Sequence, residues 1–358
     1  MKIVLTGGGT AGHVTPNIAL LPTLAKLGYQ VEYIGSHNGI ERGLINLCEI
    51  PYHSISSGKL RRYFDLKNFT DIFRIIKGFF DALLILRKIR PNIIFSKGGF
   101  VAVPVALAGH ILKIPIVIHE SDITPGLATK IIMPFAKVVC ASFPETVKHT
   151  TKGILTGSPI REELILGDKT IAMQLCGFDK FDKKSQKPII LVIGGSLGAT
   201  TINKHIFELL PTLLEDFHVI HVCGKGNISV DACPGYAPFE YVQEELPHIF
   251  AAADLIISRA GANTLFELLA LKKPHLLIPL TRAASRGDQI LNAESFEKQG
   301  FSAVLQEEQL ENLYLAILDL YEKREMYVSQ MQTKETSKGI DNVIAQIKQW
   351  TKVGKDIE

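Results

Sequence analysis

The chain has 358 residues, 46% of them hydrophobic and 21% charged, which excludes an intrinsically disordered protein, a collagen-like fibre and a coiled coil. Its formal net charge of +3 is too small to indicate a nucleic-acid-binding protein, and its length allows two domains with separate cores. Five scattered cysteines without a CxxC pair predict neither a disulfide framework nor a zinc site, and they favour a reducing cytosol. No signal peptide and no apolar stretch of membrane-spanning length is recognisable, so we expect a soluble protein.

An internal repeat organises the chain. Residues 3–35 and residues 189–224 each contain an apolar run, a glycine-rich turn, a helix-length segment with the letters LLPTL and a second apolar run. A second pair, IIFSKGG at residues 93–99 and LIISRAG at residues 255–261, follows in the same order. Short apolar runs that alternate with helix-length segments indicate βαβ units in a parallel sheet. The repeat therefore predicts two similar α/β domains, each a doubly wound parallel sheet.

The boundary between the domains is expected near residues 157–159, so that the first domain spans residues 1–160 and the second spans residues 161–339. The residues from about 340 to 358 have apolar side chains at helical spacing and are too few for a domain. We expect them to form a helix that packs back on the first domain. Ligands of open α/β sheets bind beyond the carboxyl ends of the strands, which predicts a ligand cleft between two domains that face each other.

The first glycine-rich turn, from Gly7 to His13, follows a predicted strand and opens a helix, where backbone N–H groups and the helix dipole favour an anion. It contains the GxGxxG spacing of dinucleotide sites. However, Glu32 lies inside the second apolar run and not at its end, where it would bind a ribose. The turn from Gly194 to Gly198 repeats the arrangement, although either turn also permits tight packing of strand on helix. Two such turns favour a pyrophosphate or phosphosugar ligand more strongly than either turn alone.

His13 stands at the start of the helix after the first glycine-rich turn, where the helix dipole disfavours a charged imidazole. A neutral imidazole near a substrate is suited to act as a general base. The alternative is a histidine that only makes a hydrogen bond within the turn. The pair His119-Glu120 ends another predicted strand in the same half, and it either orients a substrate or ties down its own loop.

In the second half, Glu267 lies one to two turns into the helix that follows Arg259. A carboxylate there can accept hydrogen bonds from two ribose hydroxyls, or it is an ordinary solvated helix charge. Asp288 and Gln289 follow the predicted strand at residues 276–280, and they either bind sugar hydroxyls or cap their loop. No spacing of His, Cys or Asp residues indicates a metal site, so we expect neither a metal nor a cofactor.

A basic segment at residues 59–90 has nine lysines and arginines against three aspartates, with aromatic and aliphatic residues at helical spacing between them. One interpretation is a helix that packs on the core and has a solvated basic face. The other adds contact of its basic and outward aromatic residues with an anionic membrane surface. The sequence leaves both interpretations open.

Six motifs together resemble the MurG family, the N-acetylglucosaminyltransferases of bacterial peptidoglycan synthesis. They are GGGTAGH, HESDITPGLATK, TGSPIR, GGSLGA, SRAGANTLFE and SRGDQILNA, which run in family order from residue 7 to residue 293. The resemblance implies two Rossmann-like domains of the GT-B type. It further implies inverting transfer of GlcNAc from UDP-GlcNAc to the C4 hydroxyl of MurNAc in undecaprenyl-pyrophosphoryl-MurNAc-pentapeptide (lipid I), which forms lipid II. The enzyme would act peripherally at the cytoplasmic face of the bacterial cell membrane, without nucleic acid.

The resemblance also implies site residues. The donor UDP-GlcNAc would be bound by Thr10, Ala11, Gly12, His13, Arg161, Gly195, Ser196, Val242, Gln243, Glu267, Asp288 and Gln289. Within this set, Arg161 would lie near the UDP phosphates and Glu267 would hold the ribose. Uracil would lie against the backbone near residues 242–244, and the pair at 288–289 would contact the sugar.

The general base implied by the resemblance is either His13 or Asp122, and the sequence does not choose between them. Some family members have asparagine where Asp122 stands and two glutamines where Asp288 and Gln289 stand, which leaves those contacts less secure than the fold. Membrane contact would fall on the basic segment, at Arg61, Arg62, Phe79, Phe80, Arg87 and Lys88.

Three alternatives remain at the level of sequence. A UDP-GlcNAc 2-epimerase or a diacylglycerol glycosyltransferase would share the fold. An NAD-dependent dehydrogenase is disfavoured by the lack of an acidic residue at the strand end. A non-catalytic scaffold subunit of a membrane transferase is disfavoured because both His13 and Glu267 are present.

Overall fold

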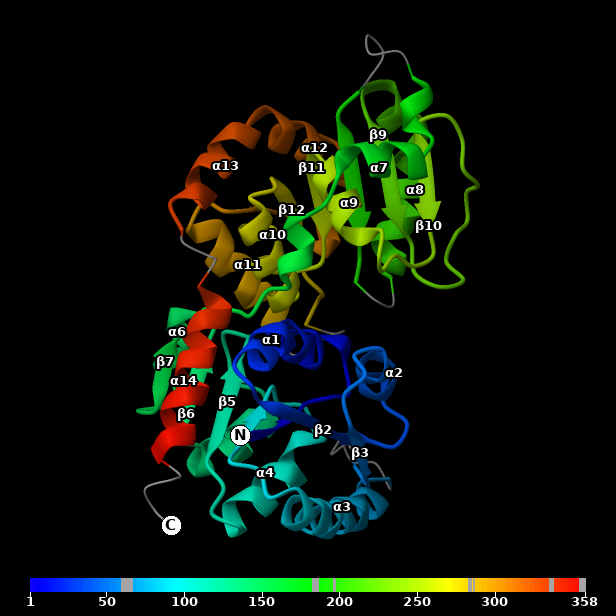
Figure 1. Cartoon of the computed structure of the whole chain (residues 1–358). Helices are drawn as coiled ribbons and strands as arrows, with labels where there is room; N and C mark the ends of the chain where they lie inside the picture. Colours follow the sequence, from blue (N-terminus) through cyan, green and yellow to red (C-terminus); the bar gives the residue numbers. More distant parts are fainter. Residues whose placement is uncertain are drawn as a thin grey trace. The chain divides into compact units, whose positions relative to one another are not determined.

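The computed structural model describes residues 1–58, 67–181, 187–195, 198–282, 285, 287–334 and 338–353. The chain divides into two compact units, which Figure 1 shows in the colours of the sequence. Unit 1 comprises Met1–Arg161 together with Ser337–Glu358, and unit 2 comprises Glu162–Thr336. Each unit is built on one parallel sheet, so the predicted α/β fold class with two doubly wound sheets is confirmed.

The described part of unit 1 has a sheet of seven parallel strands in the order β3-β2-β1-β4-β5-β6-β7. The strands are β1 (Lys2–Thr6), β2 (Gln30–Ser36), β3 (Tyr52–Ile55), β4 (Ile93–Ser96), β5 (Ile116–Glu120), β6 (Val138–Ala141) and β7 (Gly153–Leu155). The chain moves outward from β1 to β3 and then returns to β4 on the other side of β1. This reversal places the topological switch point between β1 and β4, where open α/β sheets bind their ligands.

Helices cover both faces of this sheet because its strands are apolar on both sides. The helices are α1 (Thr15–Lys26), α2 (Ile40–Asn46), α3 (Lys67–Ile89), α4 (Ala102–Ile111), α5 (Leu127–Ile132), α6 (Pro144–Val147) and α14 (Gly339–Val353), with 3₁₀ turns η1 (Ala11–His13) and η2 (Met133–Phe135). Ile3 and Leu5 belong to a core that includes residues of α1 and α14, whereas Val4 belongs to a second core that includes residues of α3 and α4. Successive residues of a strand point to opposite faces, which explains this alternation.

The C-terminal helix α14 packs within unit 1, against α1, β4 and β5. Val343, Ile344 and Ile347 are buried in the same core as Leu20 and Leu24 of α1. Two hydrogen bonds add to this contact. The Asn342 amide donates to the carbonyl of Thr156 over 3.1 Å, and the Tyr29 hydroxyl donates to the hydroxyl of Thr351 over 3.3 Å.

The described part of unit 2 has six parallel strands in the order β10-β9-β8-β11-β12-β13. They are β8 (Ile189–Ile193), β9 (His218–Val222), β10 (Tyr236–Phe239), β11 (Leu255–Ser258), β12 (His275–Leu277) and β13 (Ala303–Val304). Its helices are α7 (Lys169–Leu175), α8 (Thr200–Asp216), α9 (Leu246–Ala252), α10 (Ala262–Leu271), α11 (Asp288–Lys298), α12 (Leu313–Glu322) and α13 (Arg324–Gln332), with 3₁₀ turns η3 (Glu162–Ile165), η4 (Phe178–Lys180) and η6 (Glu307–Asn312). The switch point lies between β8 and β11, the counterparts of β1 and β4, as the internal repeat requires.

Among the described residues, no helix is long and apolar enough to cross a bilayer.

Candidate active site

The first glycine-rich turn leaves β1 at the switch point of unit 1 and is held by a buried carboxylate. Glu41 of α2 accepts a hydrogen bond from the backbone N–H of Gly9 over 3.1 Å and another from the backbone N–H of Ser36 over 3.0 Å. A Cβ atom on Gly8 would lie 2.6 Å from the Glu41 carboxylate, so a larger residue there would displace this carboxylate. Gly9 has φ of +87°, a left-handed conformation that also favours glycine.

His13 ends the 3₁₀ turn η1, two residues before α1 begins, and its ring is half-buried. Its Nδ1 atom lies 3.1 Å from the carbonyl oxygen of Gly8 and 3.1 Å from the hydroxyl oxygen of Thr10. A carbonyl oxygen only accepts, so the contact with Gly8 places the hydrogen on Nδ1. The neutral ring then carries its lone pair on Nε2. The hydrogen bond within the turn is therefore compatible with a role as base. It selects the tautomer in which Nε2 can accept a proton.

A buried lysine that the sequence interpretation did not single out lies beside this turn. Lys97 follows β4, and its backbone N–H donates to the carbonyl of Thr6 over 2.9 Å, directly across the switch point. Its ammonium donates to the hydroxyl of Ser121 over 2.9 Å, and the side chain is almost completely buried. Burial lowers the pKa of Lys97 to about 8, although the charges of Glu120 and Asp122 act in the opposite direction. Lys97 thus joins the first glycine-rich turn to the loop that carries Asp122.

The pair His119-Glu120 ties down its own loop, which is one of the two interpretations that the sequence left open. His119 is buried and donates from Nε2 to the carbonyl of Gly157 over 2.9 Å. Burial, and after it the charge of Lys97, lowers the pKa of His119 well below its ordinary value, so the ring is neutral at physiological pH. The Glu120 carboxylate accepts from the backbone N–H groups of Asp122 over 3.1 Å and of Gly126 over 3.0 Å.

Asp122 is half-buried in the loop that Glu120 holds. Its carbonyl oxygen accepts from the hydroxyl of Thr146 over 2.9 Å, and the same hydroxyl donates to the carbonyl of Ile123 over 3.0 Å. The backbone of this predicted base is therefore fixed on both sides.

The second glycine-rich turn leaves β8 at the switch point of unit 2. Gly195 and Gly198 have φ of +96° and +76°, and a Cβ atom on Gly198 would lie 2.1 Å from the carbonyl oxygen of Cys223. Asn203, in the first turn of α8, donates to that same carbonyl over 2.7 Å. The turn is thus packed as closely against the end of β9 as glycine allows. Ser196, which the family resemblance places on the UDP phosphates, lies outside the described residues.

Glu267 is half-buried in the second turn of α10, which begins at Ala262 just beyond the carboxyl end of β11. Val242 is buried, and the backbone N–H of Gln243 donates to the Glu245 carboxylate over 3.1 Å. Arg161 is the last residue of the first segment of unit 1. Of the implied donor residues, five thus belong to unit 1, namely Thr10, Ala11, Gly12, His13 and Arg161, and the others belong to unit 2.

The loop between β12 and α11 carries the predicted sugar contacts Asp288 and Gln289. Gln289 accepts with its Oε1 atom a hydrogen bond from the backbone N–H of Leu280 over 3.1 Å, which leaves its amide group as a donor. Ser285 accepts from the backbone N–H of Gly287 over 3.1 Å in the same loop. Gln289 therefore caps its own loop, which is one of the two interpretations that the sequence left open, and its contact with a sugar stays a prediction.

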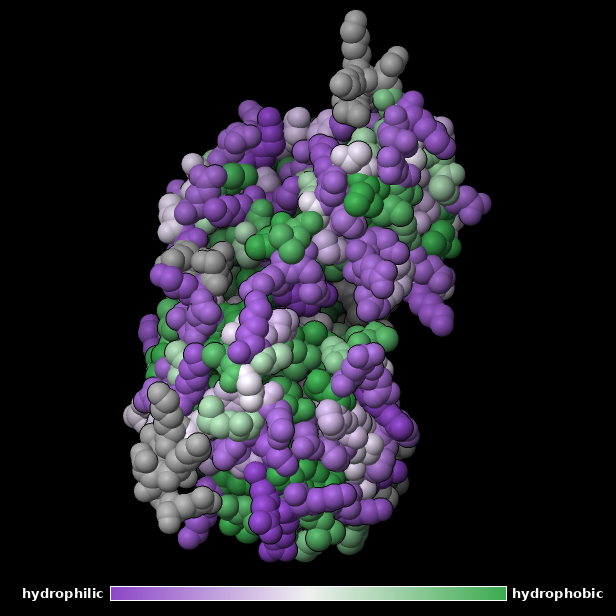
Figure 2. Space-filling model, viewed as in Figure 1, coloured by the Kyte–Doolittle hydropathy of each residue, from purple (hydrophilic) through white to green (hydrophobic). Residues whose placement is uncertain are grey.

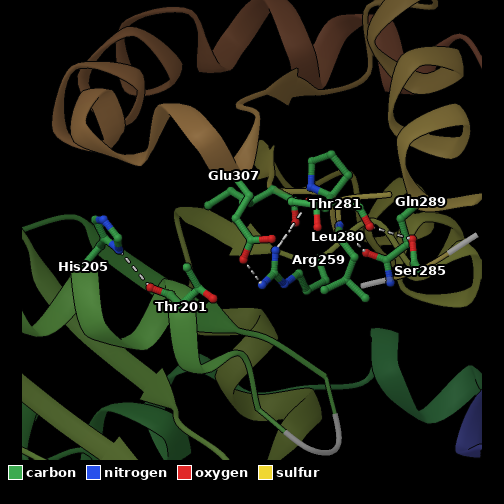
Figure 3. A network of polar contacts seen from close by, with 10 residues as sticks. Thr201, His205, Arg259, Leu280, Thr281, Ser285, Gln289 and Glu307 are labelled. Carbon is green, nitrogen blue, oxygen red and sulfur yellow. Dashed lines mark hydrogen bonds and ion pairs between the residues drawn. The ribbon is translucent and has the colours of Figure 1, made fainter. Parts of the chain in front are cut away.

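A polar network beneath this loop was not foreseen from the sequence. Arg259, at the end of β11, forms an ion pair with Glu307 of η6 in which Nη2 and Oε1 are 2.6 Å apart, and both side chains are largely buried (Figure 3). Arg259 also donates to the carbonyl of Ile278 over 3.2 Å. The two charged residues are 48 positions apart in the sequence, and no local pattern marks Glu307 as a partner of Arg259.

No group of three or more His, Cys, Asp or Glu residues that could hold a metal ion occurs within the described ranges.

Comparison with known proteins identifies both halves of the chain. Residues 3–141 match the glycosyltransferase family 28 N-terminal domain, and residues 189–347 match the glycosyltransferase family 28 C-terminal domain. Over 355 residues, the chain is 56% identical to the UDP-N-acetylglucosamine--N-acetylmuramyl-(pentapeptide) pyrophosphoryl-undecaprenol N-acetylglucosamine transferase of Clostridium tetani, with 98% of each chain covered.

Solved structures agree with this match. The chain is similar to MurG of Acinetobacter baumannii with a TM-score of 0.71 and 25% identity, over 96% of this chain and 98% of that chain. It is also similar to the UDP-GlcNAc 2-epimerase of Neisseria meningitidis bound to UDP-GlcNAc, with a TM-score of 0.64 and 15% identity, over 98% of this chain and 99% of that chain. At that identity the likeness to the epimerase shows the fold alone.

Two parallel α/β units have the GT-B fold, and the two family 28 domains identify the chain as a glycosyltransferase. The matches are specific enough to go further. The chain belongs to glycosyltransferase family 28 and, within it, to the MurG family of N-acetylglucosaminyltransferases, as the sequence motifs predicted.

Proposed function

We propose that this protein transfers GlcNAc from UDP-GlcNAc to the C4 hydroxyl of MurNAc in lipid I, with inversion at the anomeric carbon, and so forms lipid II. The observation that carries the proposal is 56% identity, over 98% of both chains, to a transferase named for this reaction. The presence of both family 28 domains in the expected order supports it.

In this mechanism His13 takes the proton of the acceptor hydroxyl through Nε2. The hydrogen bond from Nδ1 to Gly8 supports the assignment, since it leaves the lone pair on the other nitrogen. Asp122 is the alternative base. Its carboxylate already interacts with the charge of Lys97, whose pKa it raises.

The departing UDP acquires negative charge, which the backbone amides of the second glycine-rich turn, the N-terminus of α8 and Arg161 would stabilise. Glu267 would accept the ribose hydroxyls, and the backbone near Val242 and Gln243 would contact uracil. Asp288 and Gln289 would contact the sugar. The position of Glu267 near the start of α10, at the carboxyl edge of the sheet, supports the ribose assignment.

Contact with an anionic membrane would use the outward face of α3. Phe73, Phe80 and Leu84 are between 56% and 70% exposed, although each is a large apolar side chain. They fall within roughly 40° of one another around the helix axis at 100° per residue. The exposed Lys77, Arg87 and Lys88 flank this sector. In Figure 2 the surface over α3 accordingly carries hydrophobic and hydrophilic residues side by side.

This surface revises the membrane residues expected from the sequence. Phe80 is exposed as expected, whereas Phe79 is half-buried and packs against the core of unit 1 with Leu83. The interpretation as a helix that packs on the core is therefore confirmed for one side of α3, and membrane contact stays a prediction for the other side. Arg61 and Arg62 lie outside the described residues. This surface supports peripheral binding at the cytoplasmic face of the membrane, where the enzyme would reach lipid I.

A transfer assay tests the proposed reaction. The protein is incubated with UDP-GlcNAc labelled in the sugar and with a lipid I analogue in detergent, and the lipid fraction is analysed for label. We expect label in a disaccharide lipid only when both substrates are present. Release of labelled UDP-ManNAc without acceptor would instead identify an epimerase and refute the proposal, and transfer to diacylglycerol but not to the lipid I analogue would refute the acceptor.

A further inference from the structure

Glu307 lies at the carboxyl edge of the unit 2 sheet, where it forms the ion pair with Arg259 at the end of β11. The side chain of Thr201 and the backbone of Thr281 also act on its carboxylate, and both lower its pKa. Thr201 lies in the first turn of α8, directly after the second glycine-rich turn, and Thr281 lies in the loop between β12 and α11. Figure 3 shows the carboxylate of Glu307 facing Arg259.

The contacts of Glu307 continue to the predicted sugar-binding pair. Arg259, which Glu307 holds, donates to the carbonyl groups of Ile278 and Pro279. The next residue, Leu280, donates its backbone N–H to the side chain of Gln289. Three consecutive backbone positions, from 278 to 280, are thereby fixed by Arg259 and Gln289.

We infer that Glu307 is a positioning residue that holds the loop between β12 and α11 in place for the donor sugar. The inference rests on the proposed function, because the sugar contact of Gln289 is part of that function. Glu307 would touch no substrate and would act through Arg259.

The carboxylate has to be ionised to hold Arg259 in this way. Burial raises the pKa of Glu307, but the hydrogen bond and charge of Arg259, with further hydrogen bonds from Thr201 and Thr281, outweigh burial and bring the pKa below its ordinary value. Only 9% of the Arg259 side chain and 12% of the Glu307 side chain are exposed. Glutamine at this position would therefore leave a buried guanidinium without its counter-charge.

The test compares binding of UDP and of UDP-GlcNAc by calorimetry in Glu307→Gln. The uridine half of the donor is assigned to α10, whose buried residues Leu265 and Leu268 fix it in the core independently of the loop. We therefore expect UDP-GlcNAc affinity to fall about tenfold or more, and UDP affinity to fall less than about threefold. Steady-state kinetics should show the same loss as a raised KM for the donor, with the KM for the acceptor unchanged.

Asp319→Asn is the matched control. Asp319 pairs with Lys323 at the same distance of 2.6 Å, but on the exposed surface of α12, so its loss removes one carboxylate charge without touching the loop. It should bind both ligands as the wild type does. Unchanged UDP-GlcNAc affinity in Glu307→Gln, or an equal loss for both ligands, overturns the inference. A wild-type protein that binds neither ligand would instead refute the proposed function.

A double variant keeps the inference testable if Glu307→Gln does not fold. Arg259→Leu combined with Glu307→Leu removes both charges, so no unpaired charge is left buried, and such replacements often keep or raise stability. We expect the double variant to fold and to bind UDP, but to keep the weakened affinity for UDP-GlcNAc, because the carbonyl groups of Ile278 and Pro279 have lost their donor. A folded double variant with wild-type affinity for UDP-GlcNAc would overturn the inference.

Discussion

Nδ1 of His13 donates to the carbonyl oxygen of Gly8 over 3.1 Å, and this single contact decides which nitrogen of the ring can accept a proton. The carbonyl belongs to the glycine-rich turn that the buried Glu41 holds in place. The tautomer of the proposed base is thus set by the backbone of the turn.

Replacing His13 by alanine should lower kcat by about 10²–10⁴-fold, because a positioned general base contributes roughly this factor. UDP affinity should change little, since the uridine is assigned to unit 2. The measurement is steady-state kinetics combined with calorimetry of UDP binding. His149→Ala, at an exposed position of unit 1, is the control and should behave as the wild type.

Two results would reassign His13. A folded His13→Ala variant with nearly unchanged kcat would remove it from the chemistry. A variant that loses UDP binding would move His13 to the donor site and make Asp122 the better candidate for the base.

Donor binding should depend on the carboxylate of Glu267. A hydrogen bond to a charged group is worth about 1.5–3 kcal/mol, so Glu267→Ala should raise the Kd for UDP about tenfold or more. Glu208→Ala is a suitable control because Glu208 is also a helical glutamate of unit 2, with 58% of its side chain exposed. Calorimetry that finds the same UDP affinity in Glu267→Ala as in the control would reject the ribose assignment.

Binding to anionic vesicles should weaken when the charges that flank the exposed face of α3 are removed. Each basic residue near such a surface contributes about 1 kcal/mol, so Arg87→Gln with Lys88→Gln should lower partitioning about thirtyfold at low salt. The difference should shrink in high salt, where charges are screened over a few ångströms. Lys204→Gln with Lys298→Gln removes two exposed charges from unit 2 and serves as the control. Equal sedimentation of both double variants with the vesicles would exclude this face.

The buried Lys97 should make stability depend on alkaline pH. Its pKa is about 8 in the folded chain and 10.5 in the unfolded chain, so between these values the unfolded chain binds more protons. The contribution of Lys97 to the free energy of unfolding therefore increases as pH rises from about 8 to 10.5. The cost of burying the ammonium, about 3 kcal/mol from the difference in pKa, is fully present below pH 8 and is relieved by pH 10.5.

Lys97→Met tests this dependence. The variant should be more stable than the wild type at pH 7, and its advantage should fall steadily between pH 8 and pH 10.5, as measured by denaturant unfolding across that range. Lys148→Met, at an exposed position of unit 1, should show no such trend relative to the wild type. An advantage that stays constant with pH would mean that burial does not lower the pKa of Lys97 in the folded protein.

The sequence alone was enough for the class of fold and for the family. Repeated apolar runs and glycine-rich turns are local patterns, and their order along the chain determines that each half is a parallel α/β sheet with a switch point after its first strand. Candidate residues such as His13 and Glu267 could be named because they stand at fixed offsets from those turns. The spacing of residues also indicated a helix within residues 59–90 that combines apolar and basic side chains.

Only the tertiary structure decided which side of α3 is covered, because sequence periodicity does not tell on which face the sheet will lie. Phe79 and Phe80 are neighbours in the sequence, and the packing of unit 1 buries one and exposes the other. It likewise decided that His119 and Glu120 hold a loop, since the partner Gly157 lies 38 residues from His119. The pairing of Arg259 with Glu307 depends on the order of strands in the unit 2 sheet, which brings together side chains 48 residues apart. Contacts of this kind have no periodic or local pattern in the sequence, because they form only when the strands have paired in the sheet.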